Sequence, residues 1–366
     1  MKNKLNILQI STPSDWRGGE QQAFYLLDEL KQMNVATEML CPQHSIMQHR
    51  CEEKNFSTHT FGRKGVLGIN IARAIQTLCK KNKYDIIHTH DSHAHSAAVI
   101  AAAWFKIKSR IVVSRRVDFA VSDSIFSKWK YNHPQIEKII CVSNAIKQIT
   151  KPAIQNKKRL EVVYSGIDIQ QFNSYSKGKL RKEFSIGDDT KIVVNTSALV
   201  DHKDYHTFVN AANLIKEKIQ DVKFFIIGEG PMEESIKKYI DFHQSAEFIH
   251  LTGFRKDVKE LLMDADVFMM SSKTEGLGTS LLDAMAAHIP VVATRAGGIP
   301  EIIEEPGNFG LLADVGNPLQ LADHCCALLS NSEMANHFAE QGAIRAKQFS
   351  KSITAQNILS IYQSIA

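Results

Sequence analysis

Residues 271–301 read SSKTEGLGTSLLDAMAAHIPVVATRAGGIPE, and this stretch decides the fold. The apolar run 267–270 before it is typical of a buried strand, and Glu275 follows that strand as an isolated carboxylate. The flexible turn 276–280 then leads into a helix-like run and a second apolar strand. A glycine turn at a helix start leaves backbone N–H groups unpaired at the positive helix end, which makes an anion site. An anion site beside a carboxylate predicts a ligand with phosphate and hydroxyl groups, such as a nucleotide-sugar.

The same strand–helix rhythm extends outward from this stretch to both ends of the chain. Alternation of short apolar strands with helical periodicity predicts parallel sheets that are covered by helices on both faces. The expected strands are 5–10, 35–41, 85–88, 110–114, 138–142, 192–196, 223–227, 247–251, 267–270 and 291–293. The best-defined helices are 21–32, 68–80, 96–105, 258–263 and 281–287. The fold class is therefore α/β, with two doubly wound Rossmann-like domains in series.

The length of the chain supports two domains. A chain of 366 residues is too long for one ordinary core. The polar segment 174–182 could contribute little to a core, so the boundary is expected near it, with domains at 1–168 and 169–349. Ligands of such sheets bind beyond the carboxyl ends of the strands, so a cleft between the domains is the expected site.

Charge is divided unevenly along the chain. Residues 1–165 hold 25 Lys and Arg against 13 Asp and Glu, whereas the remainder holds 19 against 26. A basic half with interleaved aromatics, such as Phe126 and Trp129, suits contact with an anionic membrane surface or an acidic acceptor. The alternative is an ordinary solvated surface. Nucleic acid is not expected as a partner, because no recognised binding motif accompanies the charge. Six scattered cysteines without metal or redox spacing indicate reduced thiols and a cytoplasmic protein.

Two motifs of the first half follow predicted strands. Gly18 and Gly19 open a helix and would let the backbone approach a diphosphate, or they form a plain turn. A GxGxxG fingerprint is missing there, which disfavours a nicotinamide dehydrogenase. The histidine-rich run 88–95 resembles a metal nest, but no cysteine or acidic set completes it, so no metal is expected. We expect a polar wall instead, with His90 or Asp91 touching the acceptor.

The second half carries the predicted donor site. Lys203 follows a strand and could neutralise a leaving diphosphate. Glu275 in the turn and Asp283 in the next helix can face one ligand, one at the sugar and one at the ribose. Two weaker turn signals would shape the nucleotide pocket, and their residues are Gly228, Gly253, Phe254 and Arg255. The run Asp264-Ala265-Asp266 mimics a metal-holding pair, but its place between a helix and a strand favours a structural role.

The ordered series of motifs resembles the retaining glycosyltransferases of the GT-B fold, glycosyltransferase family 4. The series comprises Gly18-Gly19-Glu20, Asp85-Ile86-Ile87-His88-Thr89-His90, Ser165-Gly166-Ile167-Asp168 with Phe172, Lys203, Gly228-Glu229-Gly230-Pro231, Thr252-Gly253-Phe254 and residues 271–301. The resemblance implies a UDP- or GDP-linked sugar donor held mainly by the second domain and an acceptor held mainly by the first. It implies no metal and no other cofactor, and a last helix, about 350–366, that packs back on the first domain.

Three positions depart from the family pattern. Asp283 stands where the family has a second glutamate, so the ribose contact is longer or water-bridged. Ser197-Ala198 replaces a glycine-arginine pair, which removes one cation and leaves more to Lys203. Arg115 and Arg116 occur where many members have a histidine, and we hypothesise that an arginine supplies that positive charge. The neighbouring Asp118 is assigned to the acceptor side.

The sequence therefore predicts a glycosyltransferase that acts on a glycan, lipid-linked or lipopolysaccharide-type acceptor, at the inner face of the membrane. Backbone amides of the turn would bind the diphosphate, and the residues concerned are Gly276, Leu277, Gly278 and Thr279. No carboxylate pair has glycosidase spacing, so no protein nucleophile is assigned. Two alternatives stay open: a sugar-nucleotide epimerase of similar architecture, and a non-catalytic nucleotide-sugar-binding subunit.

Overall fold

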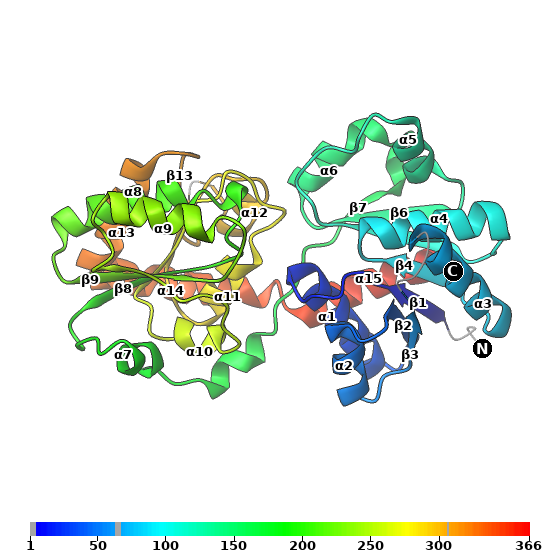
Figure 1. Cartoon of the computed structure of the whole chain (residues 1–366), viewed down its shortest axis with the longest axis horizontal. Coiled ribbons are helices and arrows are strands. Elements are labelled where there is room, and N and C mark those ends of the chain that lie inside the picture. Colours follow the sequence, from blue (N-terminus) through cyan, green and yellow to red (C-terminus); the bar gives the residue numbers. More distant parts are fainter. Residues whose placement is uncertain (1–4, 63–66, 306) are drawn as a thin grey trace. The chain divides into compact units, whose positions relative to one another are not determined.

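The computed structural model describes residues 5–62, 67–305 and 307–366, which form two compact units (Figure 1). Unit 1 consists of Met1–Gly166 and Lys351–Ala366, and unit 2 is Ile167–Ser350. The first division falls two residues before the expected boundary at 168, and the second falls one residue after 349. Each unit is an open parallel sheet with helices on both faces, so the α/β class is confirmed.

Unit 1 contains a seven-stranded parallel sheet in the order β3-β2-β1-β4-β5-β6-β7. Its strands are β1 (Asn6–Ile10), β2 (Ala36–Pro42), β3 (Thr58–Phe61), β4 (Ile86–Thr89), β5 (Arg110–Arg115), β6 (Ile136–Cys141) and β7 (Leu160–Val162). Its helices are α1 (Gly18–Gln32), α2 (Ile46–Glu53), α3 (Leu67–Lys81), α4 (Ser92–Phe105), α5 (Ile125–Asn132), α6 (Asn144–Thr150) and α15 (Lys351–Ile365), with short 3-10 turns η1 (Lys151–Ala153) and η2 (Lys157–Arg159).

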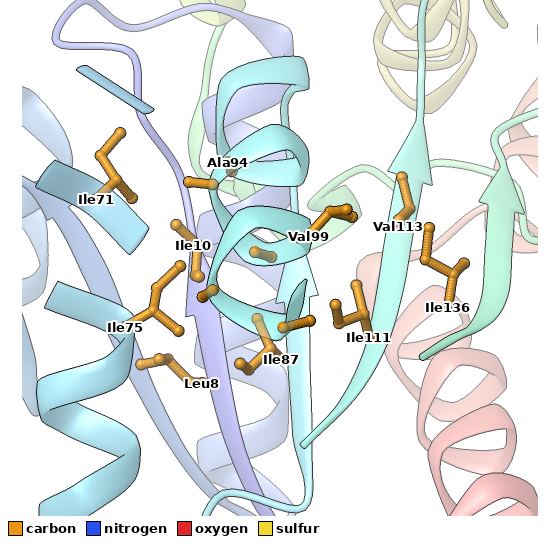
Figure 2. Packing of buried hydrophobic residues seen from close by; sticks show 14 of the residues in the cluster. Leu8, Ile10, Ile71, Ile75, Ile87, Ala94, Val99, Ile111, Val113 and Ile136 are labelled. Carbon is orange, nitrogen blue, oxygen red and sulfur yellow. The ribbon is translucent and has the colours of Figure 1, made fainter. Parts of the chain in front are cut away.

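Alternating side chains of the strands build two cores in unit 1. Leu8 and Ile10 of β1 pack with Ile71 and Ile75 of α3 on one face, a cluster that Figure 2 shows together with Ile87 and Ile111. Ile7 of the same strand points to the opposite face and packs with α1 and α15. Because both faces of the sheet are covered, β1 carries buried apolar side chains on both of its faces, as strands of parallel sheets do.

The last helix, α15, belongs to unit 1 although it follows unit 2 in the chain. Ala355, Ile358 and Tyr362 are buried against α1 and the sheet. The Tyr362 hydroxyl lies 2.5 Å from Nδ1 of His88 in β4, whose Nε2 lies 2.8 Å from Ser114 Oγ. Ile353 of this helix is 37% exposed, whereas Ala355 is fully buried.

Unit 2 contains a six-stranded parallel sheet in the order β10-β9-β8-β11-β12-β13. Its strands are β8 (Lys191–Thr196), β9 (Val222–Ile227), β10 (Ile249–Leu251), β11 (Val267–Met270), β12 (Val291–Thr294) and β13 (Leu311–Ala313). Its helices are α7 (Lys179–Glu183), α8 (Tyr205–Lys218), α9 (Glu233–Phe242), α10 (Val258–Leu262), α11 (Thr279–Ala286), α12 (Ile299–Ile303), α13 (Pro318–Ser330) and α14 (Ser332–Lys347), with 3-10 turns η3 (Ile169–Ser174) and η4 (Asp201–Lys203).

Both sheets reverse direction of winding at one point. In unit 1 the reversal lies between β1 and β4, and in unit 2 it lies between β8 and β11. At such a point the loops beyond the carboxyl ends of two neighbouring strands diverge and leave room for a ligand. In unit 2 these loops carry Lys203 and Glu275. In unit 1 they carry Gly18, Gly19 and the histidine-rich run.

Two helices begin earlier than their periodicity predicted. Helix α1 begins at Gly18 rather than at residue 21, because Arg17 and Glu20 form a capping box. Helix α4 begins at Ser92 rather than at residue 96, because the Asp91 side chain accepts hydrogen bonds from His93 N and Ala94 N. Within the described ranges, no helix has both the length and the apolar character needed to cross a bilayer.

Candidate functional site

An ion pair joins the two loops at the winding reversal of unit 2. The Lys203 ammonium lies 2.5 Å from Oε1 of Glu275, and their side chains are only 15% and 9% exposed. The Ser272 hydroxyl donates a second hydrogen bond to the same oxygen at 2.8 Å. The sequence had assigned the two residues to different parts of a ligand. The structure instead places them in direct contact.

The loop that carries Lys203 is fastened to the loop that carries Glu275. Ser271 Oγ donates at 3.0 Å to the carbonyl oxygens of both Lys203 and Asp204. Lys273 N donates to His202 O at 2.7 Å, and Thr294 of β12 donates from Oγ1 to Ser272 O at 2.6 Å. This framework fixes both loop backbones and thereby holds the ion pair in place.

Three glycines allow this close packing. A Cβ at Gly297, whose φ is +51°, would lie 1.9 Å from Glu275 O, and the next residue donates from Gly298 N to that oxygen at 3.0 Å. A Cβ at Gly228 would lie 2.0 Å from Ser197 O, and one at Gly230 would lie 2.4 Å from Leu199 O. Gly228 was expected to line the nucleotide pocket, but its lack of a side chain serves the packing of the Lys203 loop.

The turn after Glu275 presents the start of α11. Gly278 precedes the helix with φ +92°, and no side chain in the described ranges caps this helix start. The backbone N–H groups of the first turn, from Thr279 onward, are therefore suited to an anion. Leu277 contributes only its backbone, because its side chain is buried in the core. Gly276 stands half-buried beside Glu275.

Asp283 lies one turn into α11, half-buried beside η3. Burial raises the pKa of its carboxyl to about 6, the nearby Lys259 ammonium lowers it, and Asp168 raises it. Lys259 donates to Gln171 Oε1 at 2.6 Å, and Gln171 donates to Asp168 Oδ2 at 2.8 Å. Residues Asp168 and Lys259 thus belong to the surroundings of Asp283, which sequence reasoning did not find.

We expect Asp283→Asn to stabilise unit 2 at pH 7.5. The folded-state pKa of about 6 lies above the usual 3.8, so the stability tied to the protonated carboxyl is present below pH 4 and is lost as pH rises through 6. The neutral amide avoids this loss, which amounts to roughly 2–3 kcal/mol. Thermal unfolding at pH 4, 6 and 7.5 measures the gain. Exposed Asp241 provides the control: a gain in Asp241→Asn of equal size, or a gain for Asp283→Asn that persists at pH 4, would contradict the assignment.

Gly253, Phe254 and Arg255, which were predicted to shape the nucleotide pocket, follow β10. Phe254 is 59% exposed, and Gly253 accepts a hydrogen bond from Gly228 N at 3.0 Å. Arg255 forms ion pairs with both Glu183 of α7 and Asp257. Hydrogen bonds to Asp257 and Glu183 raise the pKa of Arg255, and the hydrogen bond from Arg255 lowers the pKa of Asp257. The guanidinium is thus engaged by two carboxylates, and its contact with the donor stays a prediction.

At the winding reversal of unit 1, the glycines at the start of α1 are open. No atom of the described residues comes within 4 Å of a Cβ placed on Gly18 or Gly19, so a ligand could approach this backbone. Glu20 is buried and caps α1, because its carboxylate accepts a hydrogen bond from Arg17 N at 3.0 Å. Burial raises the Glu20 pKa.

His90 and Arg116 meet at the carboxyl ends of β4 and β5. Arg116 donates from Nη1 to His90 O at 3.1 Å, and its Nη2 lies 3.3 Å from His90 Nδ1. The other ring nitrogen of His90 lies 3.0 Å from Gln9 Oε1. Burial lowers the pKa of His90 well below its usual value and that of Arg116 to about 10. Among the described residues Arg116 forms no ion pair, and its Nε has no hydrogen-bond partner.

Three other residues were assigned to this region, and the structure shows contacts inside the fold for two of them. Asp91 uses both carboxylate oxygens inside the fold, on Thr12 and on the first turn of α4. Arg115 is buried and donates to Tyr131 Oη at 3.1 Å and to Phe119 O. The structure thus gives Asp91 a capping role and Arg115 a packing role, and the acceptor and catalytic contacts expected of them stay predictions. Asp118 is half-exposed in the loop after β5.

The aspartates that mimic a metal pair are structural. Asp264 accepts from Gly178 N, from Leu180 N at 2.6 Å and from Arg181 N at 3.2 Å, and so caps α7. Asp266 accepts from Ile192 N at 2.8 Å and so joins β11 to β8. In the part of the chain that the structure describes, no group of three or more histidine, cysteine or acidic side chains could hold a metal ion.

The fold and the loops at the winding reversal define the class of the protein. Residues 16–171 match Glycosyltransferase Family 4, and residues 176–345 match Glycosyl transferases group 1. The chain belongs to these glycosyltransferases and has their GT-B fold.

Known proteins resemble the chain along most of its length. It is 26% identical over 300 residues to N-acetyl-alpha-D-glucosaminyl L-malate synthase of Bacillus anthracis, which covers 81% of this chain and 77% of that protein. It is 25% identical to the N,N'-diacetylbacillosaminyl-diphospho-undecaprenol alpha-1,3-N-acetylgalactosaminyltransferase of Campylobacter jejuni, over 78% of each. The structure of Anabaena HepE in complex with UDP and glucose matches with a TM-score of 0.83 and 21% identity, over 98% of this chain and all of that one.

Proposed function

We propose that this glycosyltransferase transfers a sugar from a UDP-linked donor to a hydroxyl of a glycan or lipid-linked acceptor, with retention of anomeric configuration and without a metal. The observation that carries the proposal is the ion pair of Lys203 and Glu275 beside the uncapped start of α11. A cation, a carboxylate and helix amides at one sheet end match a diphosphate and a hydroxylated sugar. UDP rather than GDP is favoured because the Anabaena structure contains UDP.

The ion pair suggests how the donor is received. Lys203 would turn from Glu275 to the diphosphate, because two negative phosphates attract the ammonium more strongly than one carboxylate does. That exchange releases Glu275 Oε1 to accept hydrogen bonds from the sugar hydroxyls, while Ser272 continues to hold it. When the anomeric C–O bond breaks, the electron pair goes to the diphosphate oxygen, and Lys203 with the α11 amides stabilises its charge. Asp283 would accept from the ribose.

The new glycosidic bond forms from the same face of the sugar. The acceptor oxygen attacks the anomeric carbon on the side that the diphosphate leaves, and its proton passes to the departing phosphate oxygen. No protein nucleophile is assigned, because Glu275 Oε1 accepts from Ser272 and, after the exchange with Lys203, from the sugar hydroxyls. In unit 1, the open backbone of Gly18 and Gly19 can approach the diphosphate, and Arg116 would supply positive charge near the donor sugar.

The acceptor and the place of reaction are proposed together. The name of the Campylobacter relative describes a sugar bound through diphosphate to undecaprenol, which is a membrane lipid. A lipid-linked acceptor fits the basic character of unit 1, which holds 26 Lys and Arg against 13 Asp and Glu. We propose that the protein acts from the cytoplasm at the inner face of the membrane.

Donor binding is testable by thermal stabilisation. We expect UDP-glucose or UDP-N-acetylglucosamine to raise the melting temperature of the protein, with smaller shifts for GDP-mannose and ADP-glucose. A ligand at a hundred times its dissociation constant adds about 2.7 kcal/mol. The shift should persist in EDTA and should be lost in Lys203→Ala. The proposal would be contradicted if none of these donors raised the melting temperature.

Product analysis tests the chemistry separately. NMR coupling constants of the anomeric proton should show the same configuration in donor and product. Incubation of the donor without acceptor distinguishes an epimerase, since an epimerised donor would favour that alternative. Donor binding without transfer to any glycan or lipid-linked acceptor would favour a non-catalytic subunit.

A further inference from the structure

Large apolar side chains are exposed along one segment of unit 1, from the end of β5 to the end of α5. Ile125 is 89% exposed, Phe119 63% and Phe126 50%, and Val117 and Trp129 are each 37% exposed. These five residues, here called the apolar tip, lie within 13 positions of the sequence. An exposed apolar cluster of this kind marks an interaction site rather than a solvated surface.

Local structure explains why the apolar tip faces outward. Ser124 caps α5 by accepting from Ser127 N at 3.2 Å. The helix then turns Lys130 and Tyr131 inward, where Lys130 donates to Ser92 Oγ at 3.1 Å and the Tyr131 ring packs edge-on against His95 at 4.7 Å. On the outer side the Phe126 and Trp129 rings lie 5.6 Å apart. The outer face of α5 thus carries large exposed apolar side chains, whereas a surface helix ordinarily exposes polar ones.

A band of positive charge adjoins the apolar tip. Asn132, at the end of α5, donates to Ala153 O at 3.0 Å and accepts from Gln155 N at 2.7 Å, and Arg159 donates to His133 O at 3.2 Å. These bonds fasten the turns η1 and η2 to α5. The residues here called the basic band are Lys151, Lys157, Lys158 and Arg159.

The basic band has little negative charge to neutralise it. Its three lysines are exposed, and in the described ranges none of its four side chains forms an ion pair with a carboxylate. In contrast, Lys128 on α5 pairs with Asp123 at 3.3 Å. Because the rest of unit 1 is also basic, the partner of this surface is expected to be negatively charged.

We propose that the apolar tip and the basic band together dock unit 1 on an anionic lipid bilayer. Aromatic and aliphatic side chains enter the headgroup boundary, while neighbouring lysines meet anionic headgroups. A second copy of this chain would require the positive bands of both copies to approach each other. The inference extends the proposed function, since docking brings unit 1 to the surface that carries a lipid-linked acceptor.

Binding to lipid vesicles tests the proposal on the full chain. We expect sedimentation with vesicles of 70% phosphatidylcholine and 30% phosphatidylglycerol, and much weaker sedimentation with pure phosphatidylcholine. Ile125→Ser with Phe126→Ser should reduce the partition coefficient by tenfold or more, and Lys157→Gln with Lys158→Gln should reduce it by about tenfold on anionic vesicles only. Trp104→Ser is the matched control, because Trp104 is also in unit 1 and is 62% exposed. It should bind as the unaltered protein does.

Fluorescence tests whether the apolar tip enters the bilayer. The chain has three tryptophans, so Trp16→Phe with Trp104→Phe leaves Trp129 as the reporter. Its emission should shift to the blue on anionic vesicles and be quenched by brominated lipid. The proposal would be overturned if the protein bound vesicles without quenching of Trp129, or if Trp104→Ser reduced vesicle binding as much as Ile125→Ser with Phe126→Ser. It would also be overturned if the protein formed concentration-dependent dimers that Ile125→Ser with Phe126→Ser abolished. Vesicle binding as expected, but without sugar transfer, would refute only the proposed function. Sugar transfer to a soluble acceptor, but without vesicle binding, would refute only the membrane docking.

Discussion

Replacement of Lys203 by alanine is expected to reduce turnover by roughly 10²–10³-fold, because the leaving diphosphate loses its cation. The same change removes the partner of Glu275, a carboxylate that is only 9% exposed. An unpaired buried charge is costly, so the variant should also lose about 2–3 kcal/mol of stability. Initial rates with a saturating donor and urea unfolding measure the two effects.

A double variant separates catalysis from stability. Lys203→Met with Glu275→Gln leaves no charge at the pair, and the glutamine can still accept from Ser272. Stability should return close to that of the unaltered protein, while turnover stays lost. Lys273→Ala is the control, since this neighbouring lysine is 46% exposed and lies 3.5 Å from Asp201. Its loss should cost at most about 1 kcal/mol and leave turnover unchanged. Turnover within threefold of normal in Lys203→Ala would remove the basis of the proposed mechanism.

Gly297→Ala is expected to be the most disruptive single methyl addition in unit 2. The new Cβ would lie 1.9 Å from the Glu275 carbonyl oxygen, and no side-chain rotation can relieve a clash with backbone. The left-handed φ of +51° adds about 1–2 kcal/mol of strain for alanine. We expect a loss of more than 3 kcal/mol, or a displaced Glu275 loop with turnover reduced at least 10²-fold.

Gly316 provides the matched comparison for that experiment. Its φ is +74°, but a Cβ there meets no atom of the described residues within 4 Å. Gly316→Ala therefore reports backbone strain alone and should cost about 1 kcal/mol with normal turnover. Similar losses in the two alanine variants would mean that the contact between Gly297 and Glu275 has no special importance. Melting temperatures and rates of both proteins decide between these outcomes.

Apolar strands with regular spacing made much of the architecture predictable. The strand at Val267–Met270 was located to the residue, and most others lie within two residues of their expected ends. Three of the four edge strands were missed, namely β3, β7 and β13, whereas the fourth, β10, lies within the longer apolar stretch 247–251 that was predicted. Each missed strand has three or four residues, too few to show a periodicity, and its pairing depends on the neighbouring strand.

The site was predictable in its residues but not in its contacts. The places of Lys203 and Glu275 after strands followed from the sequence, because parallel strands end at one edge of the sheet. Their ion pair is a contact between residues 72 positions apart and depends on how two loops are packed. Ser272 and Gly297 support this ion pair. In the sequence, Ser272 was noticeable only because it lies near Glu275, and Gly297 only because it belongs to a glycine pair.

Charged side chains near the site were the least predictable. Arg255 has the residue type and the position of a ligand contact, yet Glu183 and Asp257 occupy its guanidinium. Asp91 likewise serves α4 and Thr12. A sequence motif shows where a polar group enters a loop, but the competing partners come from segments that only the folded chain brings near.

The contribution of α15 to unit 1 has a consequence for biosynthesis. Tyr362 is completely buried beside His88, and α15 covers one face of the first sheet. The ribosome translates this helix only after all of unit 2, so the first 166 residues leave the exit tunnel with one apolar sheet face covered by α1 but not by α15. Unit 2 can therefore complete its folding first. The nascent unit 1 must stay incompletely folded, or be bound by chaperones, until α15 has been synthesised.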